Sequence, residues 1–291
     1  MKVIGCVVNI MTLDPSMSFY PVGRAFQSEA MKENRFKRRL IAGETQIGLW
    51  QTLANPITTE LCAAAGFDWL LLDAEHAPHS SPNLLALLQA MNGTASEAIV
   101  RLPDTGLTSI KQVLDLGALT ILAPFVESAD QARQIVSATR YAPEGARGLA
   151  AGQIRASRWG RDRDYIDRAN DEICVLVQIE SQAGLDGLPA ILGVGGVDGI
   201  FIGPADLAAS LGHRGSIDHP DVRRAIDAAI GCAMDAGKPV GLLTLNEVLA
   251  HEYIAQGCSF VAVGTDASLL ANAVDSLAGR FLNRSVDEAS Y

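Results

Sequence analysis

The sequence predicts an α/β protein of the (β/α)8 TIM barrel class, and three observations lead to this fold. The chain has 291 residues, of which 48% are hydrophobic and 19% charged, enough apolar side chains for one large core. From residue 46 onward, short apolar runs rich in Val, Ile and Leu alternate with longer stretches of helical period, as expected for strand–helix units on a parallel sheet. About eight units can be counted, the number that closes such a barrel at a typical length of about 250 residues.

The expected strands are the apolar runs, taken in order along the chain. They cover Gln46–Trp50, Trp69–Asp73, Ala98–Arg101, Thr120–Pro124, Ile173–Glu180, Gly199–Gly203, Val240–Thr244 and Phe260–Gly264. Helices are expected between them, for example over Ser128–Arg140, Ser181–Leu192, Pro220–Ala236 and Glu247–Gln256. Gly237 and Gly257 stand where two of these helices stop before the next strand.

No linker divides the chain, so we expect one domain. Residues 1–30 are interpreted as an N-terminal tail or an over-long start, residues 31–281 as the barrel, and residues 282–291 as a C-terminal tail. A basic amphipathic segment that begins at Met31 is expected to form the first helix. The longest irregular stretch, Ala142–Glu172, exceeds a routine connection and is therefore either a binding loop or an inserted short helix.

The charge balance excludes two classes of partner. Lys plus Arg number 23 and Asp plus Glu number 33, so the net charge of -10 would repel nucleic acid and anionic membranes, and a small molecule is the expected partner. The apolar stretch near the N-terminus is too short to span a bilayer and makes a poor signal peptide. The five cysteines are odd in number and scattered, which argues against a disulfide framework and indicates the reducing cytoplasm.

An open, doubly wound sheet is the competing layout, and a dinucleotide fingerprint would support it. The glycine cluster over residues 193–199 has Asp198 where the third glycine of that fingerprint should stand, and it precedes a strand instead of following one. We therefore reject a dinucleotide site.

Charged side chains end several of the apolar runs. In a barrel of this class the chemistry lies at the carboxyl ends of the strands, which closure of the barrel brings to one rim. The residues expected there are Asp73, Glu75, His76, Arg101, Gln178, Glu180 and Asp206.

Glu180 and Asp206 are oxygen ligands at neighbouring strand ends, suited to a hard divalent cation such as Mg²⁺ or Mn²⁺. Each also has an ordinary explanation, because Asp206 is placed to cap the helix that Pro204 opens and Glu180 to be a solvated strand end. Gln178 would point into the barrel with Glu180, where a ligand explains an amide better than packing does.

His76 lies just past a strand end and can act as a base if an acid orients its other nitrogen, although a surface-loop histidine is the alternative. Nearness in sequence nominates Asp73 as that acid. Arg101 could neutralise an enolate oxygen or simply form an ion pair. Imine catalysis does not fit the chain, because none of its lysines is expected inside the barrel: Lys2, Lys32, Lys37, Lys111 and Lys238.

The matching stretches of a known family are Gln46–Trp50, Ala65–Pro78, Ile110–Asp115, Ala138–Tyr141, Val177–Glu180, Gly199–Asp206 and Phe260–Gly264. With them the chain resembles the HpcH/HpaI family of metal-dependent class II pyruvate aldolases over nearly everything from Met31 to about Phe281. The resemblance implies a barrel whose last helix is exchanged between the protomers of a homo-oligomer, expected to be a hexamer.

The resemblance also implies roles for the rim residues. Glu180 and Asp206 would hold a divalent metal, Mg, Mn or Co, Arg101 would stabilise the developing enolate, and His76 would act as the base on the substrate 4-hydroxyl.

The resemblance further implies which residues act on His76 and which contact the substrate. Asp115 would raise the basicity of His76, with Asp73 as its rival. Pyruvate would lie against Gln178, Ala205 and Asp206, and the aldehyde pocket would be lined by Trp50 and Leu243, unless these two only pack at the rim.

The reaction that the resemblance implies is retro-aldol cleavage of a 4-hydroxy-2-oxo acid, such as 4-hydroxy-2-oxoheptanedioate, to pyruvate and an aldehyde, such as succinic semialdehyde, through a metal-stabilised pyruvate enolate. The chain would then be a carbon–carbon lyase of the kind used in aromatic catabolism. Three alternatives stay open: a 2-keto-3-deoxy sugar-acid aldolase with the same site, a barrel that only binds oxo acids, and a citrate-lyase-like acyl-CoA lyase. The last would need a basic surface for its nucleotide, for which the sequence offers Arg147, Arg155, Arg158, Arg161 and Arg163.

Overall fold

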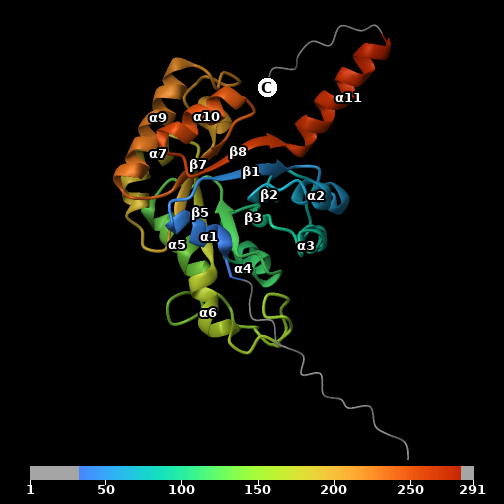
Figure 1. Cartoon of the computed structure of the whole chain (residues 1–291). Coiled ribbons are helices and arrows are strands. Elements are labelled where there is room, and N and C mark those ends of the chain that lie inside the picture. The colour runs from blue at the N-terminus through green and yellow to red at the C-terminus, as the bar shows by residue number, and fades with distance from the viewer. Residues whose placement is uncertain (1–32, 283–291) are drawn as a thin grey trace, which may run out of the picture.

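The computed structural model describes residues 33–282, so the expectations for residues 1–30 and 283–291 lie outside the described residues. Its strands form a closed barrel in which each strand pairs in parallel with the next and β8 pairs with β1 (Figure 1). The predicted (β/α)8 barrel is confirmed. The strands are β1 (Gln46–Gln51), β2 (Trp69–Asp73), β3 (Glu97–Arg101), β4 (Thr120–Ala123), β5 (Cys174–Ile179), β6 (Gly199–Ile202), β7 (Val240–Leu243) and β8 (Phe260–Thr265).

No end of a strand differs from the predicted one by more than one residue. Strand β4 ends at Ala123, one residue early, because Pro124 has no N–H to continue the ladder.

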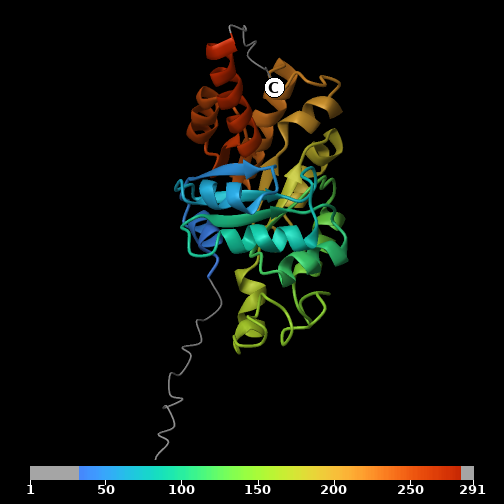
Figure 2. The same cartoon turned by 90° about the vertical axis from the view of Figure 1, so that its right-hand side faces the viewer.

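The helices surround the barrel (Figure 2). They are α1 (Arg35–Ile41), α2 (Pro56–Ala63), α3 (Ser81–Ala90), α4 (Leu107–Asp115), α5 (Ala129–Thr139), α6 (Tyr165–Glu172), α7 (Gln182–Leu192), α8 (Pro204–Ser210), α9 (Pro220–Asp235), α10 (Glu247–Gln256) and α11 (Asp266–Leu282). Ser128 and Ser181 cap α5 and α7 by accepting backbone N–H groups with their hydroxyl oxygens. Gly257 ends α10 at a φ of 112°, a conformation that glycine adopts without strain.

The barrel interior is filled by apolar side chains, and α1 closes its amino end. Phe36 of α1 meets Trp69 and Phe260 edge to face, with ring centroids 6.2 and 5.7 Å apart. All three are fully buried. This aromatic cluster excludes water from the amino end and leaves the carboxyl end as the open rim.

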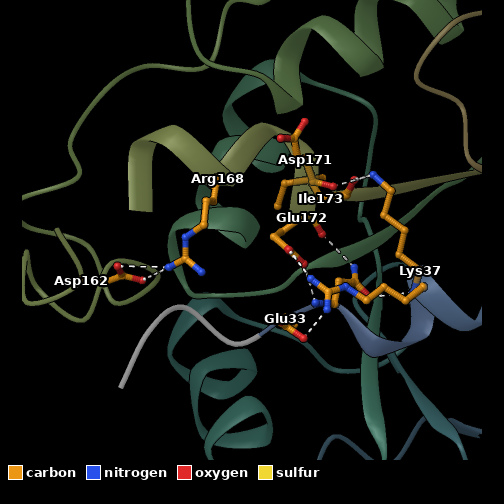
Figure 3. Close-up of polar contacts among 9 residues, drawn as sticks. Glu33, Lys37, Asp162, Arg168, Asp171, Glu172 and Ile173 are labelled. Carbon is orange, nitrogen blue, oxygen red and sulfur yellow. Dashed lines mark hydrogen bonds and ion pairs between the residues drawn. The ribbon is translucent and has the colours of Figure 1, made fainter. Parts of the chain in front are cut away.

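Polar contacts fasten α1 to α6 at the amino end (Figure 3). Asn34, the N-cap of α1, donates its backbone N–H to Glu172 Oε2 at 2.6 Å, and Lys37 Nζ donates to the carbonyl oxygens of Asp171 and Ile173 at 2.8 and 2.7 Å. The irregular stretch Ala142–Glu172 thus ends in an inserted short helix, one of its two expected forms, which packs at the end of the barrel away from the rim.

Helix α11 extends away from the barrel (Figure 1). Its first residue, Asp266, is buried and accepts hydrogen bonds from the backbone N–H groups of Thr52 and Leu53 at 2.7 and 3.2 Å. Further along, apolar side chains face outward, with Val274 54% and Phe281 79% exposed. Across residues 33–282, no helix has both the length and the apolar character that a bilayer crossing needs.

Candidate active site

Parallel pairing of β2 with β3 places Asp73 directly opposite Arg101 at the rim. Arg101 Nε and Nη2 donate to Asp73 Oδ1 and Oδ2 at 3.0 and 2.6 Å, and Trp50 Nε1 of β1 donates to Asp73 Oδ2 at 3.1 Å. All three side chains are buried, and the guanidinium lies 4.8 Å from the centre of the Trp50 ring. Burial alone would raise the pKa of Asp73, but its hydrogen bonds and ion pair with Arg101 lower that pKa below its ordinary value.

Glu75 joins the same group of charges. Arg101 Nη1 lies 2.9 Å from Glu75 Oε2. Burial raises the pKa of Glu75, with the negative charges of Asp73 and Asp206 acting in the same direction and Arg101 against them. Glu75 is expected at the rim from the sequence, and its position between Asp73 and His76 is the signal that indicates a role in the site.

Glu180 follows β5 and is 1% exposed. Its Oε1 accepts the backbone N–H of Phe125 at 2.8 Å, and its Oε2 accepts Gln178 Nε2 at 2.5 Å. Burial raises the pKa of Glu180 to about 7, with the charges of Asp206 and Glu75 acting in the same direction and the Phe125 N–H acting against them. Acids from three different strand ends thus lie near enough to one another for their charges to interact.

The oxygen atoms of this site fit a hard divalent cation. Gln178 Oε1 is buried and has no hydrogen-bond partner in the described chain. Gly203, at the start of α8, packs so tightly that a Cβ there would come within 2.5 Å of Glu180 Oε2 and 2.9 Å of Gln178 Nε2. The N-cap of α8 is Gly203, so the interpretation of Asp206 as that cap is wrong. The half-buried Asp206 lies in the first turn of this helix.

His76 projects from the rim, with 64% of its side chain exposed and Nε2 4.0 Å from Glu75 Oε2. Asp73 contacts His76 only by accepting its backbone N–H at 3.2 Å. Asp115 ends α4, far from the rim where that helix begins, and its Oδ1 pairs with Arg147 Nη2 at 2.8 Å. Within residues 33–282, neither carboxylate bonds the His76 imidazole.

The remaining candidates border this site. Trp50 is 4% exposed and packs on Phe201 with ring centroids 5.5 Å apart, and the partly exposed Leu243 packs against the same interior cluster. Ala205, beside Asp206, is exposed at the start of α8. Lys238 donates Nζ to the Val197 carbonyl oxygen, before β6 and away from the rim.

A second group of metal-binding residue types, His213, His219 and Asp221, lies at the start of α9. The two imidazole rings stack with centroids 3.5 Å apart and planes 14° apart. Since the nitrogen lone pairs lie in the ring planes, two stacked rings do not point at one ion. His219 Nδ1 also accepts the backbone N–H of Asp221 at 3.2 Å, so one of its two ring nitrogens is already hydrogen-bonded.

Comparisons with known proteins agree with this geometry. The family model described as HpcH/HpaI aldolase/citrate lyase matches residues 46–273. The chain is 53% identical over 256 residues to a hydroxypyruvate/pyruvate aldolase of Deinococcus radiodurans, covering 88% of this chain and 92% of that protein. It is 51% identical over 249 residues to a 4-hydroxy-2-oxo-heptane-1,7-dioate aldolase of Escherichia coli, covering 86% and 95%.

A solved structure supports the same assignment. The crystal structure of an HpcH/HpaI aldolase/citrate lyase family protein from Burkholderia cenocepacia J2315 superposes with a TM-score of 0.83 at 38% identity, covering 85% of this chain and 99% of that one. The expectation of a carbon–carbon lyase is confirmed, and the chain belongs to the HpcH/HpaI aldolase/citrate lyase family.

Proposed function

We propose that this enzyme cleaves 4-hydroxy-2-oxo acids, such as 4-hydroxy-2-oxoheptanedioate, to pyruvate and an aldehyde, which for that substrate is succinic semialdehyde. The observation that carries the proposal is the buried Glu180 carboxylate at the rim, near enough to Asp206, Glu75 and Arg101 for their charges to act on its pKa. The names of the two relatives, both pyruvate or 2-oxo acid aldolases, support the substrate class.

Glu180 and Asp206 would hold a divalent cation, Mg, Mn or Co, which when bound supplies positive charge that polarises the 2-oxo group of the substrate. Gln178 supports this arrangement, because its Nε2 holds Glu180 while its Oε1 stays free to face a ligand. Pyruvate would lie over Gln178, Ala205 and Asp206, next to the close-packed Gly203.

Arg101 is placed to meet negative charge that develops on the substrate. Arg101 donates two of the five N–H groups of its guanidinium to Asp73, and its Nη1, which lies 2.9 Å from Glu75 Oε2, would donate to a substrate oxygen. The rigid pairing with Asp73 holds the guanidinium in place before the substrate arrives.

His76 would accept the proton of the substrate 4-hydroxyl. The C3–C4 bond then breaks, its electron pair forms the pyruvate enolate, and protonation at C3 releases pyruvate. Trp50 and Leu243 would border the space that the aldehyde leaves through.

We also propose that the protein is a homo-oligomer, with a hexamer as the expected size, in which α11 packs against a second copy. The outward apolar side chains of α11, such as Val274 and Phe281, support this arrangement. Any action of Asp115 on His76 would require Asp115 from another protomer, because its own α4 carries it away from the rim.

The reducing cytoplasm remains the expected location, since Cys62, Cys174, Cys232 and Cys258 are all free.

A substrate panel tests the proposed function. Metal-loaded protein is incubated with 4-hydroxy-2-oxoheptanedioate, a 2-keto-3-deoxy sugar acid and a citrate-lyase-type acyl-CoA substrate, and product formation is followed by coupled dehydrogenases. We expect the highest kcat/KM for the 4-hydroxy-2-oxo dioic acid. A higher kcat/KM for the sugar acid would favour the sugar-acid aldolase, and cleavage confined to the thioester would favour the acyl-CoA lyase.

A further inference from the structure

The turn between β4 and α5 contains a strained residue, Phe125, whose backbone contacts the candidate metal ligand Glu180. Phe125 has a backbone φ of +49°, a left-handed conformation that a bulky aromatic residue rarely adopts. Its backbone N–H donates to Glu180 Oε1 at 2.8 Å, and the N–H of Val126 donates to the Gln178 carbonyl oxygen at 3.0 Å. The strained backbone therefore supplies the N–H that holds one carboxylate oxygen of Glu180.

The side chain of Gln131 fastens this turn from α5. Its Nε2 donates to the Phe125 carbonyl oxygen at 3.0 Å, and its Oε1 accepts the backbone N–H of Glu127 at 2.9 Å. The Gln131 backbone N–H is in turn bound by the Ser128 hydroxyl at 3.2 Å, which fixes the start of the helix. One amide thus binds the chain on both sides of Val126.

Glu127 ties the same turn to the residue that follows Glu180. Its Oε1 accepts the Ser181 hydroxyl at 2.6 Å, and Ser181 also caps α7 by accepting the Gly184 N–H at 3.0 Å. A left-handed non-glycine residue persists only when its surroundings over-determine its conformation. The bonds made by Gln131 and Glu127 are such surroundings for Phe125.

We propose that Gln131 is a positioning residue of this active site, which holds the Phe125 N–H on Glu180 and so keeps that carboxylate facing the cation. The inference rests on the proposed function, because the cation is part of it. Without the Gln131 amide, Phe125 is free to relax toward negative φ, which turns its N–H away from Glu180. Gln131 has no hydrogen bond to Glu180 itself, so its effect passes through the turn.

The test compares Gln131→Met, which keeps the size of the side chain without its hydrogen bonds, with Gln182→Met. Gln182 is an exposed glutamine in the first turn of α7, and its side-chain amide donates to Asp186 at 2.8 Å on the same helix. On metal-free full-length protein, the Mn²⁺ dissociation constant is measured by electron paramagnetic resonance and the exchange rate of the Phe125 amide by hydrogen exchange. We expect Gln131→Met to weaken Mn²⁺ binding about 10-fold, as loss of supporting contacts does at metal sites, and to speed exchange at Phe125. Gln182→Met should change neither.

A second set of variants, made in a Phe125→Gly protein, distinguishes an effect of Gln131 on the turn from a general loss of stability. Glycine adopts a left-handed φ without strain, so in a Phe125→Gly protein the hydrogen bonds of Gln131 are less necessary to keep residue 125 in that conformation. There, Gln131→Met should weaken Mn²⁺ binding by less than about threefold. Two results would overturn this inference without affecting the proposed function. One is an equal loss of Mn²⁺ affinity from Gln131→Met in the wild-type and Phe125→Gly proteins. The other is a Gln131→Met protein with unchanged Mn²⁺ affinity and unchanged exchange at Phe125. A wild-type protein that binds no Mn²⁺ would overturn the proposed function and this inference with it.

Discussion

The guanidinium of Arg101 and the carboxylate of Asp73 form a bidentate ion pair, with nitrogen–oxygen distances of 3.0 and 2.6 Å at the rim of the barrel. Both residues are at most 6% exposed. The pair fixes the direction in which the remaining N–H groups of Arg101 point, and lysine cannot reproduce this planar fork.

We therefore expect Arg101→Lys to lower kcat for pyruvate release by about 10² to 10³, because the donors that stabilise developing negative charge are lost while the charge is kept. Steady-state kinetics on metal-saturated protein measure this change. A variant that keeps kcat and changes KM alone would show that Arg101 binds the substrate without stabilising the transition state.

Asp73→Asn should reduce the free energy of unfolding at pH 7 by about 3 to 5 kcal/mol, because the buried Arg101 loses the carboxylate that binds two of its nitrogens and keeps only the partly exposed Glu75 as an anion. The pKa of Asp73 lies below its ordinary value, so the ionised carboxylate stabilises the fold above that ordinary value, and the contribution is lost as the pH falls through the lowered pKa. Urea unfolding of both proteins should thus show a difference that is constant near neutral pH and shrinks below about pH 4. A difference that does not change with pH would contradict this explanation.

Cation binding should depend on pH because of Glu180, whose pKa is raised to about 7 in the protein without metal, chiefly by burial. A cation binds the ionised carboxylate, so below pH 7 binding must release a proton, whereas above pH 7 it releases none from this group. We expect the Mn²⁺ affinity to fall about tenfold per pH unit below 7 and to level off above 8. Titration calorimetry between pH 5.5 and 8.5 measures this, and a flat profile would contradict it.

Gly203→Ala should weaken Mn²⁺ binding at least about 10-fold, because the added methyl group would come within 2.5 Å of Glu180 Oε2 and push the carboxylate aside. Gly231→Ala is the matched control, since this glycine lies inside α9 with nothing within 4 Å of the new Cβ. The control should keep its affinity and gain up to about 1 kcal/mol of stability from the higher helix propensity of alanine. Equal affinities in both variants would show that the fit at Gly203 is unimportant.

The barrel could be predicted from the sequence because buried parallel strands are continuous apolar runs and each helix follows its strand directly. The rim residues could be predicted from the fold, since a charged residue at the carboxyl end of a barrel strand lies at the rim. Strands distant in sequence, such as β2 and β5, then brought Asp73 and Glu180 to the same rim.

The rest of the site depends on contacts that cannot be predicted from the types of the residues involved. The Phe125 N–H that holds Glu180 is a backbone group, present at every residue other than proline, and its direction comes from a left-handed φ. The location of Asp115 depends on which end of α4 it occupies, and its pairing with Arg147 depends on the path of the irregular stretch before α6. Neither feature has a sequence period or motif.

The central claim is that Glu180 and Asp206 together hold the cation to which the oxo acid binds. The most direct measurement is a crystal structure of the protein with Mn²⁺ and pyruvate, with anomalous scattering locating the metal. We predict an anomalous peak between these two carboxylates, in contact with the pyruvate oxygens and absent in Glu180→Ala. Pyruvate bound at the rim with no ion beside it, or an ion bound elsewhere, would contradict the claim.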